Sequence, residues 1–138
     1  MRSTGYHELD HPADVALHVR GSDLSSLFLN ASRGLLHLLR CGREPSSPDR
    51  PPIEIALGAD DLETLMVDWL GELLYLVERH GCCPTVEHVE VSVPPRLDAI
   101  VHLCPECSPR RELKAATYAG LTITRGEAGF EAEIVLDA

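Results

Sequence analysis

Residues 59–81, ADDLETLMVDWLGELLYLVERHG, have the pattern of an amphipathic helix, because their apolar residues recur at helical spacing. Asp60 and Glu63 are spaced as an approximate capping box at its start, and Gly81 can end it. Gly71 in mid-helix costs about 1 kcal/mol against alanine, and close packing against a neighbour would explain it. The apolar face consists of Leu62, Leu65, Met66, Trp69, Leu73, Leu76 and Val77.

A second amphipathic helix is predicted from residue 22 to residue 40, with Ser22 or Asp23 as its cap. Outside the two helices, apolar and polar residues alternate, which is typical of half-buried strands. Pro12 suits a break between the first two strands, since it lacks a backbone donor. The expected strands are residues 5–11, 15–19, 53–57, 86–93, 96–103, 113–118, 121–125 and 130–137.

These elements predict an α+β fold. Strands that follow one another through short connections pair mostly antiparallel, and the two helices would cover one face of the sheet. We therefore expect a two-layer domain. A chain of 138 residues has no room for a second independent core, so we assign residues 1–138 to a single domain.

The charge of the chain argues against direct binding to nucleic acid. Its formal net charge is −10, from 22 acidic and 12 basic residues, and such a surface is repelled by phosphates. Cations and basic protein partners suit it better. The apolar runs are too short to span a membrane and the start lacks a signal-peptide core, so we expect a cytoplasmic location without membrane contact.

The five cysteines cannot all pair within one chain. Cys104 and Cys107 form an isolated CPEC sequence. A structural zinc ion would need further ligands, which could come only from Cys82, Cys83 or a histidine such as His102. We favour reduced thiols, as is usual in the cytosol.

Acidic groups near both ends of the chain are candidate metal ligands. Asp14 follows the His-Pro-Ala turn, Asp137 is the next-to-last residue, and Ala138 carries the terminal carboxylate. If the first and last strands lie side by side, these groups could meet, and a cation would relieve their repulsion. Oxygen ligands favour Ca²⁺, Mg²⁺ or Mn²⁺ over zinc. The alternative is that Asp14 caps a turn and Asp137 is solvated.

Four motifs, in this order, resemble the archease family over nearly the whole chain. They are ELDHPADVALHVRG, DDLETLMVDWLGELLYLVE, LKAATY and the terminal IVLDA. The family pattern is approximately His-Thr-Ala-Asp before a strand, a Trp-Leu-Asn-Glu-Leu-Leu helix, Lys-Ala-x-Thr-Tyr, and a final aspartate next to the last residue. Pro12 and Gly71 depart from this pattern, and Ala119 stands where the family commonly has histidine.

The resemblance implies an archease-like fold and a non-enzymatic accessory protein. Archeases assist the RtcB-type RNA ligase in tRNA splicing, by promoting its guanylylation and multiple turnover. Some members are linked instead to a tRNA methyltransferase as a chaperone-like partner. By resemblance, Asp14, Asp137 and the carboxylate of Ala138 hold a divalent metal, Ca²⁺ first and Mg²⁺ or Mn²⁺ as alternatives. Lys114, the only lysine, is the functionally important one.

A small metal-dependent hydrolase is a third possibility. No recognisable base or nucleophile accompanies the acidic residues, which weighs against it.

Overall fold

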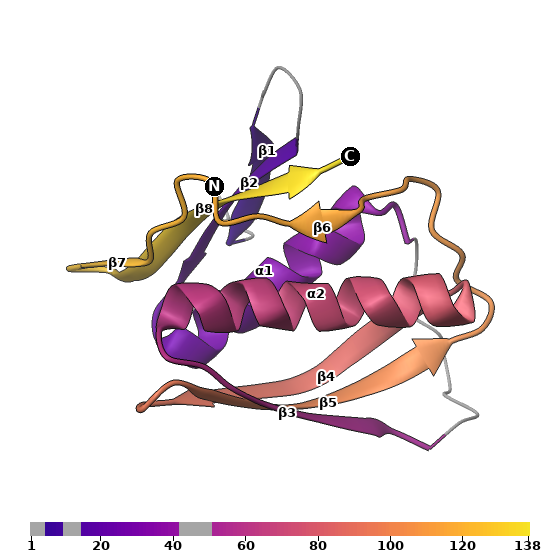
Figure 1. Cartoon of the computed structure of the whole chain (residues 1–138), viewed down its shortest axis with the longest axis horizontal. Coiled ribbons are helices and arrows are strands. Elements are labelled where there is room, and N and C mark those ends of the chain that lie inside the picture. The colour runs from indigo at the N-terminus through magenta and orange to yellow at the C-terminus, as the bar shows by residue number, and fades with distance from the viewer. Residues whose placement is uncertain (1–4, 10–14, 42–50) are drawn as a thin grey trace.

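The computed structural model describes residues 5–9, 15–41 and 51–138. Two strands precede α1, one strand lies between α1 and α2, and only strands follow α2 (Figure 1). They are β1 (Tyr6–Leu9), β2 (Val15–Gly21), α1 (Leu24–Leu38), β3 (Ile53–Gly58), α2 (Leu62–His80), β4 (Cys83–Ser92), β5 (Arg96–Cys104), β6 (Ala115–Ala116), β7 (Thr124–Gly126) and β8 (Gly129–Asp137).

The strands form two antiparallel sheets. One has the order β1-β2-β8-β6, with β7 also pairing with β8, and the other has the order β3-β5-β4. The α+β class and the antiparallel pairing are confirmed, whereas the expectation of one sheet is corrected to two. α1 connects β2 of one sheet to β3 of the other, whereas α2 connects β3 and β4 of the same sheet. Alternation along a strand indicates that one face is buried, but it does not indicate which sheet the strand joins.

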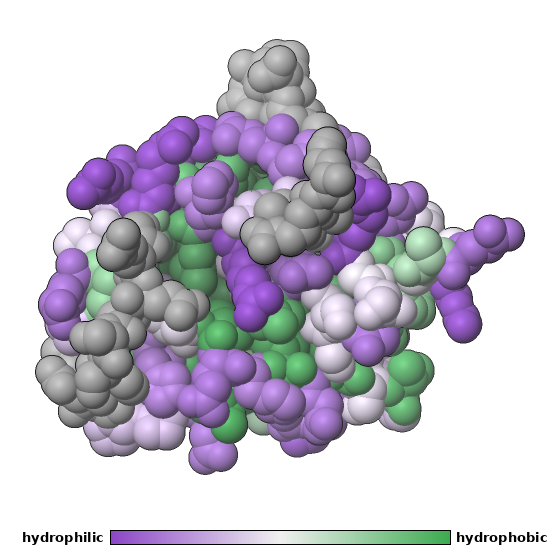
Figure 2. Space-filling view, turned by 180° about the vertical axis from the view of Figure 1, so that it is seen from behind, coloured by the Kyte–Doolittle hydropathy of each residue, from purple (hydrophilic) through white to green (hydrophobic). Residues whose placement is uncertain are grey.

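Both helices pack between the sheets (Figure 1). α1 contacts β2 above and β4 below, and its Phe28 and Leu35 are fully buried. The indole N–H of Trp69 in α2 donates a hydrogen bond of 3.0 Å to the carbonyl of Phe28, which links the two helices inside the core. Seen from the opposite side, hydrophobic residues reach the surface at the level of this helix layer, between hydrophilic borders (Figure 2).

Each helix begins at an aspartate cap. The Asp23 carboxylate accepts the amide of Ser26 at 2.7 Å, as one of the two expected caps. In α2 the cap is Asp61 rather than the expected Asp60, because the Asp61 carboxylate accepts the amide of Thr64 at 2.7 Å. Gly81 ends α2 in the left-handed conformation, with φ 66°, which confirms its assignment.

Gly71 does not pack closely against a neighbour. A Cβ built on it would meet no atom within 4 Å, which corrects the sequence interpretation of this residue. None of the helices in the described part of the chain is long and apolar enough to cross a membrane.

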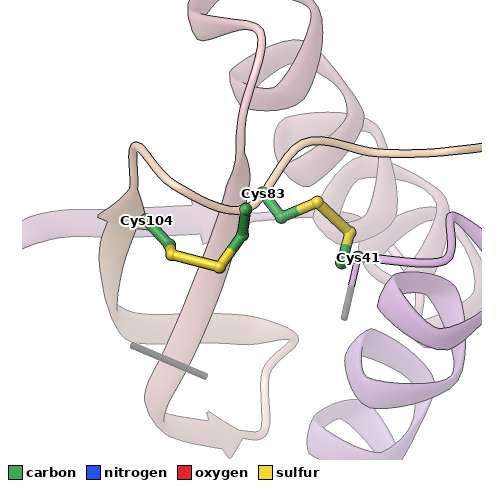
Figure 3. Close-up of a disulfide and its surroundings, with 4 residues drawn as sticks. Cys41, Cys83 and Cys104 are labelled. Carbon is green, nitrogen blue, oxygen red and sulfur yellow. A yellow bond between two sulfur atoms is a disulfide. The ribbon is translucent and has the colours of Figure 1, made fainter. Parts of the chain in front are cut away.

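The cysteines differ most from the expectation of reduced thiols. Cys41 is joined to Cys83, and Cys104 is joined to Cys107, as disulfides (Figure 3). Cys82 is buried and has a free thiol. Sequence spacing could not reveal the first pair, because its residues are 42 positions apart and meet only through the packing of α1 against β4.

Candidate functional site at the end of β8

The end of β8 brings together two of the residues selected from the sequence. β6 pairs with β8 so that Ala115 lies opposite Asp137. The amide of Lys114, one residue earlier, donates a hydrogen bond of 2.8 Å to the carbonyl of Asp137. The side chains of Lys114 and Asp137 and the last residue, Ala138, are exposed. A cation and an anion are therefore held at one end of the sheet and remain open to solvent.

On its other side, β8 pairs with β2. Val15, the first residue of β2, lies opposite Leu136, which precedes Asp137. Asp14 lies outside the described residues, so its place relative to Asp137 and Ala138 stays a prediction. In the structure, where Cys41–Cys83 and Cys104–Cys107 are disulfides, no group of three or more histidine, cysteine or acidic residues within the described ranges is arranged to hold a metal ion.

The Lys-Ala-Ala-Thr-Tyr segment is held against β8 by Thr117. Its amide donates to the carbonyl of Val135 at 2.9 Å, and its hydroxyl donates to the same oxygen at 3.0 Å. Leu113 before the segment and Leu121 after it are buried. These anchors fix the backbone on both sides of Lys114, so that its exposed side chain projects from a defined point.

Two surface hollows meet at Lys114, and sequence reasoning did not identify either. The larger, of about 560 Å³, lies between the end of α2 and residues 109–114. The smaller, of about 460 Å³, lies along α2 and includes Gly71, whose missing side chain leaves space there. Asp68 and Glu72 of α2 line the smaller hollow. A signal for it in the sequence was the mid-helix glycine between two acidic residues.

Not every acidic residue of α2 is solvated. The Glu63 carboxylate accepts a hydrogen bond of 2.9 Å from the amide of Ile123, which fastens the start of the helix to the chain before β7. The pKa of the Asp61 carboxyl is lowered by the backbone amide of Thr64. These two residues therefore have structural roles, whereas Asp68 and Glu72 remain available to a partner.

The archease protein family (MTH1598/TM1083) matches residues 6–138. A protein archease of Methanosarcina barkeri is 32% identical over 147 residues, covering 99% of this chain and 99% of the relative. One of Methanosarcina acetivorans is also 32% identical, covering 96% and 94%.

Two solved structures share the fold. The solution structure of protein 1598 of Methanobacterium thermoautotrophicum has a TM-score of 0.75 at 21% identity, over 99% of this chain and 100% of that one. A crystal structure described as an archease, possible chaperone, from Thermotoga maritima has a TM-score of 0.68 at 19% identity, over 100% and 98%.

Proposed function

The chain belongs to the archease family, and from this premise we propose that it is a non-enzymatic activator of an RtcB-type RNA ligase. The observation that carries the proposal is the exposed end of β8, where the Lys114 amide bonds to the Asp137 carbonyl and both side chains are exposed. A fixed backbone with free charged groups is suited to entering the active site of another protein.

The donors assigned by resemblance, Asp14, Asp137 and the carboxylate of Ala138, are all oxygen groups. This chemistry fits Ca²⁺, Mg²⁺ or Mn²⁺. The pairing of Val15 with Leu136 supports the assignment, since Asp14 is covalently next to Val15 and Asp137 is next to Leu136. A divalent ion bound there would neutralise charge on nucleotide phosphates, as metals generally do in nucleotidyl transfer.

Groups of the chain other than the metal ligands would bind the partner protein and orient it. Lys114 is positioned to contact a phosphate or a carboxylate of the partner, because it stands beside Asp137 on a backbone held by Thr117. The net charge of −10 favours approach to a basic protein surface and disfavours free RNA. In this arrangement the ligase binds the RNA and performs the chemistry, and the archease supplies charge and contact.

Guanylylation of the ligase tests the proposal. Purified ligase is incubated with radiolabelled GTP and Mn²⁺, with and without this protein, and the label covalently bound to the ligase is measured. We expect a faster rate and a larger extent of labelling when this protein is present. Equal labelling with and without it, across Ca²⁺, Mg²⁺ and Mn²⁺, would show that it is not an activator of that ligase.

A second candidate is a chaperone-like module for a tRNA methyltransferase. It is favoured by the exposed aromatic residues Tyr75 and Tyr118, which are 54% and 56% exposed, and by the hollow that Tyr75 lines beside Gly71. The Thermotoga maritima relative is likewise described as a possible chaperone. This function would need no metal, so protection of the methyltransferase from aggregation should persist in a chelator.

A further inference from the structure

Four cysteines from separate parts of the sequence meet at one corner of the β3-β5-β4 sheet (Figure 3). We propose that Cys41, Cys83, Cys104 and Cys107 bind one Zn²⁺ as four thiolates when their two disulfides are reduced. This site is separate from the end of β8 and does not depend on the function proposed above.

The sheet register places the two pairs side by side. Cys83 of β4 lies directly opposite Cys104 of β5, and residues opposite each other in an antiparallel pair have side chains on the same face. Cys83 is joined to Cys41 and Cys104 to Cys107, with Cα atoms 5.8 Å and 5.3 Å apart. All four sulfur atoms are thus attached to neighbouring backbone positions.

Backbone hydrogen bonds that do not depend on the sulfur–sulfur bonds involve all four cysteines. The Cys107 amide donates to the Cys104 carbonyl at 3.0 Å, which closes the CPEC turn. The Cys83 amide donates to the Cys107 carbonyl at 2.6 Å, and the Cys41 amide donates to the Leu36 carbonyl at 3.2 Å. Reduction therefore leaves a preformed arrangement of Cys83, Cys104 and Cys107, with Cys41 fixed at the end of α1.

The number, the spacing and the chemistry of the four cysteine sulfurs match those of a structural zinc site. Such sites use four ligands in a tetrahedron with Zn–S distances of about 2.3 Å, which sets the sulfur atoms about 3.8 Å apart. Cys104 and Cys107 have the C-x-x-C spacing typical of one half of the site, and Cys83 and Cys41 supply the second half.

The site is also accessible from the surface. A hollow of about 360 Å³ borders all four cysteines, and Arg33 and His37 of α1 line it as well. Thiolates are the form of cysteine that binds metal. The oxidised protein would not bind zinc here, because disulfide sulfurs carry no thiolate charge.

The redox step balances with a dithiol as the reductant. Each disulfide accepts two electrons and two protons from one dithiol, which becomes a disulfide itself. Zn²⁺ then replaces the protons of the four thiols, so zinc binding releases protons. Reoxidation of the four thiolates by a disulfide of the same class would expel the metal.

The test uses the full chain, reduced anaerobically with a phosphine, which is oxidised to its oxide as the disulfides become thiols. Co²⁺ is added as a spectroscopic probe, and Zn²⁺ then displaces it. We expect one Co²⁺ per chain with strong thiolate-to-cobalt charge-transfer absorption, fully displaced by one equivalent of Zn²⁺. The unreduced protein should show neither.

Serine variants locate the ligands. Loss of a residue that only hydrogen-bonds to a metal ligand typically weakens metal binding by roughly 10- to 100-fold. Cys104→Ser and Cys107→Ser remove a ligand itself, so each should weaken zinc binding by more than this. Cys82→Ser is the matched control, since Cys82 is a neighbouring cysteine outside both disulfides. Asp137→Asn should also retain zinc binding, which would show that the cysteine site is independent of the oxygen ligands at the end of β8.

Thermal unfolding keeps the proposal testable if a variant folds poorly. Zinc should raise the unfolding temperature of the reduced wild-type protein and of Cys82→Ser, because it binds only the folded state. Absence of thiolate absorption with Co²⁺, or equal zinc affinity in wild type and Cys104→Ser, would overturn the proposal.

Discussion

The amide of Lys114 donates a hydrogen bond of 2.8 Å to the carbonyl of Asp137, although the two residues are 23 positions apart in the sequence. This bond extends the pairing of β6 with β8 by one residue. It leaves both side chains free for a partner, because it uses only backbone atoms. The charge at this end of the sheet can therefore be changed without removing the hydrogen bond that positions it.

Lys114→Ala tests the role of the cation. We expect a large loss of ligase stimulation with a change in the free energy of unfolding within about 0.5 kcal/mol, since the side chain is exposed. Arg20→Ala is the control, because Arg20 is an exposed cation on β2 that lies opposite Glu131 in the strand register, toward the other end of β8. Equal stimulation by wild type and Lys114→Ala would exclude a role for this lysine.

A peptide tag after Ala138 tests the terminal carboxylate as a ligand. The tag moves that charge away, so the affinity for Ca²⁺ should fall while the thermal unfolding temperature without metal stays unchanged. Isothermal titration of tagged and untagged protein measures the difference. The same tag placed before Met1 is the control, and equal Ca²⁺ affinity in all three proteins would remove Ala138 from the ligand set.

The cap of α1 gives a pH-dependent contribution to stability. The pKa of the Asp23 carboxyl is lowered in the folded protein by the backbone amide of Ser26. The stabilisation is therefore complete above the ordinary value of 3.8 and is lost as the pH falls through the lower folded-state pKa.

Asp23→Ala should accordingly lower the free energy of unfolding by about 1 kcal/mol at pH 7, with a smaller difference below pH 4. Urea unfolding at several pH values measures this. Asp23→Asn, which keeps an acceptor without the charge, should lose less stability at pH 7. A difference between wild type and Asp23→Ala that grew as the pH fell would contradict the assignment.

Gly71→Ala should stabilise the protein by about 1 kcal/mol, because alanine favours the helix and the added Cβ meets no atom. Gly34→Ala in α1 is a contrasting variant: its Cβ would lie 2.7 Å from a methyl carbon of Leu17, so we expect destabilisation. Urea unfolding compares both. Loss of stability in Gly71→Ala would show that the helix does not have open space at this position.

The sequence predicts single elements of this fold better than their arrangement. Helical periodicity located α2, and alternation located the long strands β4, β5 and β8. The alternating pattern predicted longer strands than the β6 and β7 of the structure. Only a few residues of each segment pair with β8, so neither forms a long ladder. Division into two sheets depends on packing across the helix layer, which no local pattern contains.

The candidate site was predictable in part. Asp137 was selected as an acidic residue near the end of the chain and again by resemblance, and Lys114 was selected by resemblance. The structure brings their backbones together. The hollows beside α2 and the pairing of Cys41 with Cys83 were missed, because both arise from contacts between residues far apart in the sequence.

Ligase guanylylation with Asp137→Asn is the most direct test of the account. Glu133→Gln is the matched control, since Glu133 is an exposed carboxylate of the same strand, four residues before Asp137. We predict that wild type and Glu133→Gln stimulate labelling of the ligase equally in the presence of divalent metal, and that Asp137→Asn does not stimulate it. Full stimulation by Asp137→Asn would contradict the claim that this end of β8 carries the function.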